Sequence, residues 1–175
     1  MNIVTYLVLA VLITLFFVMR NYYDTGHDII DYPLHSLYHA NLDHLIANSI
    51  SFFSLSFIET VIGWKRYLFA IVFIWLVSSL LLFIYHKIVP SRKVYTVGFS
   101  AVIFGLMVVY YSLLGQGPAV TLTGLIISIL PQIFVPGISW EGHICGVLAG
   151  ILYILLFPVN KNTNVSTSPN LEYSN

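Results

Sequence analysis

The segment Tyr67–His86, YLFAIVFIWLVSSLLLFIYH, decides the fold class of this chain, because its 20 residues include no Asp, Glu, Lys or Arg. A helix that crosses the hydrocarbon core of a bilayer needs about 20 apolar residues. The rest of the chain is similarly apolar. Of its 175 residues, 58% are hydrophobic and 8% are charged, whereas an average soluble domain carries about 25% charged residues. The composition therefore predicts a protein whose solvent is lipid.

Five further apolar stretches of 15 to 18 residues accompany this segment. They are Ile3–Met19, Leu45–Ile62, Phe99–Leu114, Ala119–Val135 and His143–Phe157. None shows the period-2 alternation of a membrane barrel strand. We therefore expect an all-α polytopic membrane protein with six transmembrane helices in a bundle over residues 1–157, followed by a disordered polar tail over residues 158–175. The first stretch lacks a basic n-region and a cleavage site, so we interpret it as a span rather than a signal peptide.

Charge and cysteine content exclude several classes of function. Seven basic and seven acidic residues give a formal net charge of zero. Binding to nucleic acid needs a cluster of Lys and Arg, so no nucleic acid partner is expected. The single cysteine, Cys145, excludes an intramolecular disulfide and a thiolate metal cluster. The connection Arg20–Asp43 is a long polar loop, and loops of this length inside compact domains are usually functional.

Four polar side chains share one membrane face in this topology. His44 and Asn48 begin the second stretch, Ser100 begins the fourth and His143 begins the sixth. Helices two, four and six start from the same face, which brings these residues to one leaflet at similar depth. Polar residues inside a membrane are candidates for function. This set contains the nucleophile, base and oxyanion donors of an acyl-transfer site.

Each of these residues also has a structural explanation when it is taken alone. Ser100 can be a small packing residue, and His143 can be an interfacial ring. His44 and Asn48 are four residues apart on one helix face, where they can bond a neighbouring helix. Only the combination favours a catalytic site.

Glycines surround the same positions. Gly98 precedes Ser100 by two residues, and Gly142, Gly146 and Gly150 form two overlapping G-x-x-x-G steps. Small residues at that spacing let helix backbones approach closely. Close approach is what a serine on one helix needs to reach a histidine on another, although simple helix packing has the same requirement.

Three motifs lie at the starts of the expected helices two, four and six. They are His39-Ala-Asn-Leu-Asp-His44-Leu-Ile-Ala-Asn48, Gly98-Phe99-Ser100-Ala101 and Gly142-His143-Ile-Cys-Gly146-Val-Leu-Ala-Gly150. They are similar to H-x-x-x-x-H-x-x-x-N, G-x-S-G and H-x-x-G-x-x-x-G of the rhomboid family of intramembrane serine proteases. The chain thus resembles a rhomboid of the minimal six-helix form over roughly residues 1–157.

The resemblance implies a serine endopeptidase with a Ser-His dyad. Ser100 is expected to be the nucleophile and His143 the general base and acid. The oxyanion is expected to bind to the His44 ring, the Asn48 amide and the backbone N–H of Ser100. Phe104, where bacterial relatives often carry Tyr, is expected to hold the imidazole by packing.

The resemblance also implies the surroundings of this site. His39, Gly98, Gly146 and Gly150 are expected to support the catalytic residues. Transmembrane proteins would be the substrates, the lipid bilayer the medium, and the plasma membrane the location. No cofactor and no metal are implied. Two departures stand out: Ala101 replaces the second Gly of G-x-S-G, which is expected to widen a helix contact slightly, and the first loop lacks the Trp-Arg pair of many relatives.

Other interpretations remain open. An inactive rhomboid-like protein could bind transmembrane helices without cutting them. A small transporter would need paired charges or broken helices at mid-bilayer, whereas Glu59 lies near the end of its stretch. A metal site could form from His35, His39, His44 and Asp43, although no H-E-x-x-H motif is present.

The sequence also predicts the location or role of four further residues. Trp140 and Phe134 are candidate residues of a lateral substrate gate, as in the family, with core packing as the alternative. His86 is expected at the membrane interface. Glu141 is expected in a loop, pointing to water.

Overall fold

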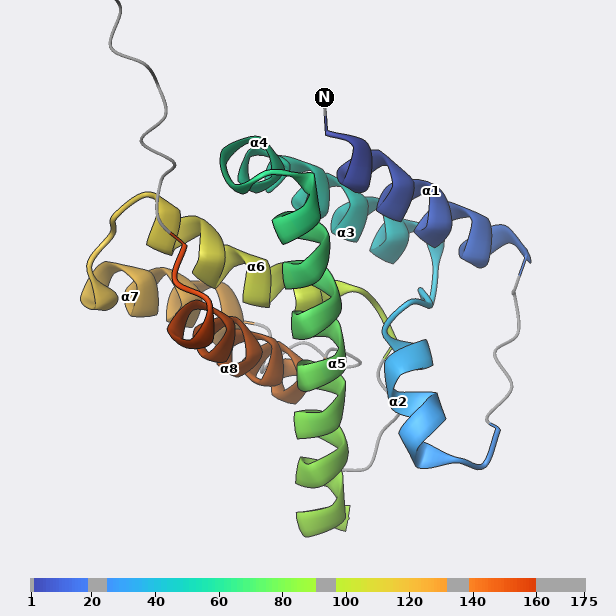
Figure 1. The fold of residues 1–175 in the computed structure, drawn as a ribbon. Coiled ribbons are helices and arrows are strands. Elements are labelled where there is room, and N and C mark those ends of the chain that lie inside the picture. The colour runs from blue at the N-terminus through green and yellow to red at the C-terminus, as the bar shows by residue number, and fades with distance from the viewer. Residues whose placement is uncertain (1, 19–24, 91–96, 132–138, 160–175) are drawn as a thin grey trace, which may run out of the picture.

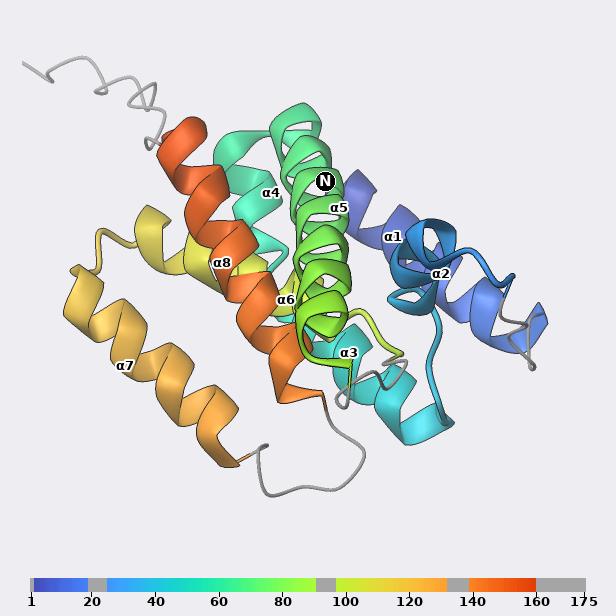
Figure 2. The same ribbon diagram turned by 90° about the horizontal axis from the view of Figure 1, so that it is seen from below.

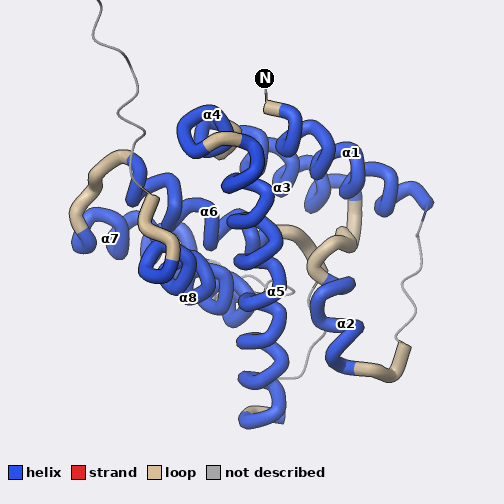
Figure 3. The backbone as a smooth tube through the Cα atoms, viewed as in Figure 1, coloured by secondary structure: helices blue, strands red, loops and turns tan. Residues whose placement is uncertain are grey.

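The computed structural model describes residues 2–18, 25–90, 97–131 and 139–159. Within these ranges it contains helices and connecting loops, which confirms the all-α prediction for this part of the chain (Figure 3). The helices are α1 (Ile3–Val18), α2 (Asp28–His35), α3 (Leu42–Ser54), α4 (Phe57–Ile62), α5 (Trp64–Ile88), α6 (Ser100–Leu113), α7 (Pro118–Ile129) and α8 (Trp140–Leu156).

The predicted helices are present, with one interruption. The second apolar stretch divides into α3 and α4, which are separated by a turn at Leu55 and Ser56. The Ser54 hydroxyl donates a hydrogen bond to the carbonyl of Ile50 at 2.8 Å. Such a side-chain bond competes with the helical backbone ladder and bends helices, which accounts for the break near this position.

The prediction that residues 20–43 form only a polar loop was wrong, because the loop contains the helix α2. Asp28 and Asp31 lie in its first turn, where negative charge favours a helix N-terminus. Tyr32 and His35 are one turn apart and are buried, so the helix has one face that packs and one that does not. The sequence alone does not predict such a short helix, because the helix is stabilised mainly by the packing of its buried face against the rest of the protein.

Two segments of the described chain are long and apolar enough to cross a membrane, Leu42–Ile62 with 21 residues and Trp64–Ile88 with 25 residues. The helices α1, α6, α7 and α8 are apolar but shorter. Large apolar side chains are exposed on α1, α3, α5, α7 and α8, among them Leu7, Ile50, Leu80, Ile127 and Leu155. A water-soluble protein rarely exposes so much contiguous apolar surface, and a lipid solvent explains it.

The helix α5 lies at the centre of the arrangement and contacts α1, α2, α4, α6 and α8 (Figure 1). The most extensive contact in the described structure joins α6 to α8. The helix α7 lies at the outer edge beside α6 and α8, away from α1 and α2 (Figure 2). The helices α6 and α8, which carry the candidate catalytic residues Ser100 and His143, therefore share the most extensive contact.

The buried carboxylate of Glu59 fixes the first helix to the fourth. It accepts hydrogen bonds from the backbone N–H groups of Val4 and Thr5, both at 2.9 Å, and from the Thr5 hydroxyl at 2.8 Å. The first N–H groups of a helix have no intrahelical acceptor, and a carboxylate there is favoured by the helix dipole. Glu59 thus has a structural role, because it joins α4 to the N-terminus of α1.

Candidate active site

The side chains of Ser100 and His143 meet across the contact of α6 and α8. The Oγ atom of Ser100 and the Nε2 atom of His143 are 2.8 Å apart and form a hydrogen bond. The two residues are 43 positions apart in sequence, and His143 is only 5% exposed. A hydroxyl within hydrogen-bonding distance of an imidazole is the geometry that a serine nucleophile and its general base require.

Capping residues set where α8 and α3 begin. The Ser139 hydroxyl accepts a hydrogen bond from the N–H of Gly142 at 3.1 Å, so α8 begins at Trp140 and His143 lies in its first turn. The Asn41 side chain likewise accepts from the N–H of His44 at 2.8 Å. Side-chain oxygens at these positions satisfy N–H groups that lack helical partners.

Two glycines of α8 let the backbone of α6 approach closely. A Cβ atom at Gly146 would overlap the backbone carbonyl of Ala101, and one at Gly150 would overlap the carbonyl of Gly105. The atoms nearest to the position of a Gly146 Cβ are backbone atoms of Ala101. Because Ala101 directly follows Ser100 and Gly146 lies three residues after His143, this contact sets the distance between the two helices at the hydrogen bond.

Gly98 brings the loop before α6 against α3. Its φ of +117° lies in the region that favours glycine. A Cβ atom there would lie 2.5 Å from Cε1 and 2.7 Å from Nε2 of His44, and 3.2 Å from Nδ2 of Asn48. The His44 ring and the Asn48 amide are thus beside the backbone that leads into Ser100.

The backbone N–H of Ser100 lies at the N-terminus of α6. Ser100 is the first residue of α6, and the first four N–H groups of a helix have no intrahelical acceptor. This N–H group, the Nε2 atom of His44 and the Nδ2 atom of Asn48 are all potential donors to one oxyanion. Within the described chain, Nδ2 of Asn48 is buried and has no hydrogen-bond partner.

Two aromatic contacts surround the histidines. The rings of Phe104 and His143 are stacked, with centroids 4.5 Å apart and an interplanar angle of 26°. The rings of His39 and His44 meet edge to face at 5.1 Å. Burial lowers the pKa of His39 to about 4, and His44 acts in the same direction. His39 is therefore neutral at pH 7 and packs on His44 as an uncharged ring.

No acidic side chain orients His143 in the described part of the chain. Its Nδ1 atom is buried without a hydrogen-bond partner there. Glu141 lies in the first turn of α8, which corrects its expected place in a loop. The arrangement is a serine–histidine pair rather than a triad of the Ser-His-Asp type.

The contacts of α2 are not indicated by any motif in the sequence. His86 was expected at the membrane interface, but it is 4% exposed, and its Nδ1 atom lies 2.7 Å from the Tyr32 hydroxyl. The carbonyl of His35 accepts a hydrogen bond from the N–H of Gly98 at 3.2 Å. Both contacts join residues more than 50 positions apart, and no motif in the sequence pairs them.

The candidate gate is described in part. Trp140 is the first residue of α8 and is partly buried against the cluster of Phe104, Val108, Leu125 and Ile129. Phe134 lies outside the described residues, as do residues 160–175 of the expected tail. Within the described ranges, no group of three His, Cys, Asp or Glu residues is placed to hold a metal ion.

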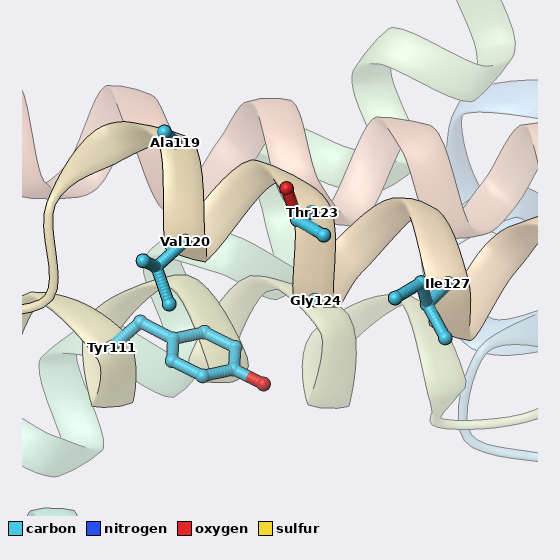
Figure 4. Close-up of a pocket in the computed structure, with 6 residues that line it drawn as sticks. All are labelled: Tyr111, Ala119, Val120, Thr123, Gly124 and Ile127. Atoms are coloured by element: carbon cyan, nitrogen blue, oxygen red, sulfur yellow. The ribbon is translucent and has the colours of Figure 1, made fainter.

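A pocket between α6 and α7 has a volume of about 410 Å³ (Figure 4). It is lined by Tyr111, Ala119, Val120, Thr123, Gly124 and Ile127. The Tyr111 ring lies in the space between the two helices, and its hydroxyl is close to Gly124 (Figure 4). Tyr111 is 11 residues along α6 from Ser100, or about 16 Å, so this pocket is separate from the candidate active site.

Comparisons with known proteins agree with the motifs. Residues 26–159 match the family model described as the rhomboid domain. A protein of Acanthamoeba polyphaga mimivirus whose name assigns it to the rhomboids is 53% identical over 163 residues, which cover 93% of this chain and 95% of that protein.

Two more distant relatives are longer than this chain. An uncharacterized protein of Mycobacterium tuberculosis is 29% identical over 71% of this chain and 58% of its own length. The Arabidopsis thaliana protein named rhomboid-like protein 14, mitochondrial, is 32% identical over 70% of this chain and 42% of its own length.

Proposed function

This chain belongs to the rhomboid family, and from that premise we propose that it is an intramembrane serine protease that cuts peptide bonds in or near transmembrane segments. The observation that carries the proposal is the 2.8 Å hydrogen bond between Ser100 Oγ and His143 Nε2. Two potential oxyanion donors, the His44 ring and the Asn48 amide of α3, lie against Gly98 just before Ser100, and the third is the backbone N–H of Ser100 itself. Family membership alone does not imply activity, whereas this geometry has the parts that acyl transfer needs.

The proposed reaction begins at Ser100. Its Oγ atom attacks the scissile carbonyl carbon while Nε2 of His143 takes the hydroxyl proton. The resulting oxyanion accepts hydrogen bonds from the His44 ring, the Asn48 amide and the Ser100 N–H. His143 then donates its proton to the leaving amine as the C–N bond breaks. Water, deprotonated by His143, hydrolyses the acyl-enzyme and restores the serine.

Helix length supports a site below the membrane surface. The helix α6 has 14 residues, so it is about 21 Å long, whereas the hydrocarbon core is about 30 Å thick. If its C-terminal end reaches one surface, Ser100 lies within the membrane. We propose that α1, the α3–α4 segment, α5, α6, α7 and α8 form six spans, with water reaching Ser100 from the other face.

The substrate follows from this depth. A peptide bond reaches Ser100 only from a segment that is itself in the bilayer, which implies a transmembrane protein. A helical substrate must unwind locally, because its backbone groups are shielded by their own hydrogen bonds. We propose Trp140, at the start of α8, as one residue of the entry path.

An inactive protein that binds transmembrane helices is the alternative, and the structure does not favour it. That function does not need a serine hydroxyl hydrogen-bonded to an imidazole. A transporter would need paired charges at mid-bilayer. The Glu59 carboxylate instead accepts hydrogen bonds from backbone N–H groups at the N-terminus of α1, which gives it a structural role.

Proteolysis is tested with purified chain in liposomes and a model substrate of one transmembrane helix. We expect cleavage within or beside the helix, with the site identified by the masses of both fragments. Cleavage only in a soluble region, or no cleavage of any of a panel of such substrates, would contradict the proposal.

We propose that the protein resides in the plasma membrane. Fractionation of cells that express the tagged chain tests this location.

Asn48→Ala is expected to lower turnover by about 10²–10³-fold, because the variant loses one oxyanion donor. The fold should retain its melting temperature, because Nδ2 of Asn48 forms no hydrogen bond in the described structure. Thermal unfolding and cleavage are measured on the same preparation. A collapse of the melting temperature with normal cleavage by the remaining folded protein would show that Asn48 is a packing residue.

Chelators are expected to leave cleavage unchanged, because the proposed mechanism activates Ser100 with an imidazole rather than a metal-bound water. The measurement is the initial rate with and without EDTA after extensive dialysis. Loss of activity that zinc restores would show that the histidines beside Ser100 hold a metal ion and would overturn this mechanism.

A further inference from the structure

The helix α2 lies beside α5 (Figure 1). Several polar contacts, which we call the α2 latch, join it to the middle and the C-terminal end of α5. The buried pair is Tyr32 and His86, with Oη and Nδ1 2.7 Å apart. The indole N–H of Trp75 donates to the carbonyl of Pro33 at 2.9 Å and to the Ser36 hydroxyl at 2.6 Å. Lys87 and Asp28 add an ion pair at 2.9 Å.

The contacts of the α2 latch differ in burial, and the buried hydrogen bond of Tyr32 and His86 is expected to contribute more than the exposed ion pair of Lys87 and Asp28. Tyr32 is 6% exposed and His86 is 4% exposed, so their hydrogen bond is shielded from water. The Tyr32 ring also packs edge to face on Phe83 at 5.6 Å. The Lys87 side chain is 61% exposed, and exposed ion pairs contribute little.

The other end of α2 is bonded to the active-site loop. The carbonyl of His35, the last residue of α2, accepts the N–H of Gly98 at 3.2 Å. On its other side Gly98 is packed against the His44 ring and the Asn48 amide. Its position thus depends on both α2 and α3, and Ser100 follows two residues later.

We propose that Tyr32 and His86 are positioning residues that act on Ser100 through α2. Tyr32 is one turn before His35 on the buried face of α2, so fixing Tyr32 to α5 fixes the carbonyl that holds Gly98. This inference rests on the proposed function for its effect on cleavage, but not for its effect on Gly98.

The test observes the Gly98 amide directly. The chain has 11 glycines, and Gly98 alone among them follows a valine, Val97. Labelling with [¹³C-carbonyl]valine and [¹⁵N]glycine therefore identifies one amide by NMR. Its hydrogen exchange reports how often the bond to His35 opens.

In Tyr32→Phe, which keeps the ring and removes the hydroxyl, we expect exchange at Gly98 to rise by about three- to tenfold. The kcat for cleavage should fall by a similar factor with KM unchanged. His86→Leu should reproduce both effects, and His86→Asn, whose amide reaches the place of Nδ1, should restore them in part. Tyr6→Phe, which removes the hydroxyl of an exposed tyrosine on α1, is the matched control and should change neither quantity.

The two proposals fail in different ways. Unchanged Gly98 exchange in both Tyr32→Phe and His86→Leu overturns the latch, whatever happens to cleavage. Equal effects in His86→Asn and His86→Leu also overturn it, because a hydrogen bond is then not what matters. Accelerated exchange in a protein whose wild type cuts no substrate supports the latch and overturns the proposed function.

Discussion

Ser100→Ala is expected to abolish cleavage of a transmembrane substrate, with a fall of about 10⁵–10⁶-fold in kcat. The variant loses the atom that attacks the carbonyl, and its neighbours cannot replace it. The fold should be retained, because Ser100 is the first residue of α6 and its side chain is bonded to His143 alone among the described residues. Cleavage in liposomes and circular dichroism of the same sample measure the two properties.

His143→Ala is the paired variant for this prediction. Because the two groups act as one unit, the double variant should be no slower than either single variant. Residual cleavage by Ser100→Ala above about 1% of the wild-type rate would contradict the assignment of the nucleophile.

Gly146→Ala is expected to disrupt the contact of α6 and α8, since the added methyl group would overlap the backbone carbonyl of Ala101. Backbone atoms cannot move away as a flexible side chain can. Overpacking of this kind typically costs about 1–3 kcal/mol, which exceeds the gain of about 1 kcal/mol from replacing glycine in a helix. Cleavage should fall by at least about tenfold, because a wider contact separates Ser100 from His143.

Gly117→Ala is the matched control, because it adds the same methyl group at a position with nothing within 4 Å. Its backbone, with a φ of −64°, suits any residue. Because Gly117 is the N-cap of α7, where alanine is less favourable than glycine, we expect a small fall in melting temperature and a cleavage rate that matches the wild type. An equal loss in both variants would contradict the argument from close approach.

The apolar helices and the residues of the candidate site could be predicted from the sequence for physical reasons. Long apolar stretches such as Tyr67–His86 have one stable form in lipid, so their presence could be predicted from composition. The parity of helix starts predicted that Ser100 and His143 lie near one face, and the structure brings the two side chains within hydrogen-bonding distance. Their hydrogen bond depends on Gly146 and Gly150, whose spacing was visible in the sequence.

The first loop could not be predicted in the same way. The helix α2 is short and is stabilised by contacts with α5, among them Tyr32 with His86. Neither residue belongs to a motif, and a pair separated by 54 positions has no local signal. His86 therefore looked like an interfacial residue. The break between α3 and α4 was missed because a single serine bond does not alter the apolar pattern.

The most direct test of the central claim is mass spectrometry of the chain after reaction with a serine-directed fluorophosphonate in detergent. We expect one adduct, on Ser100, which disappears in a folded His143→Ala variant because the hydroxyl has lost its base. An adduct on another residue, or equal labelling of Ser100 in His143→Ala, would contradict the Ser100–His143 dyad.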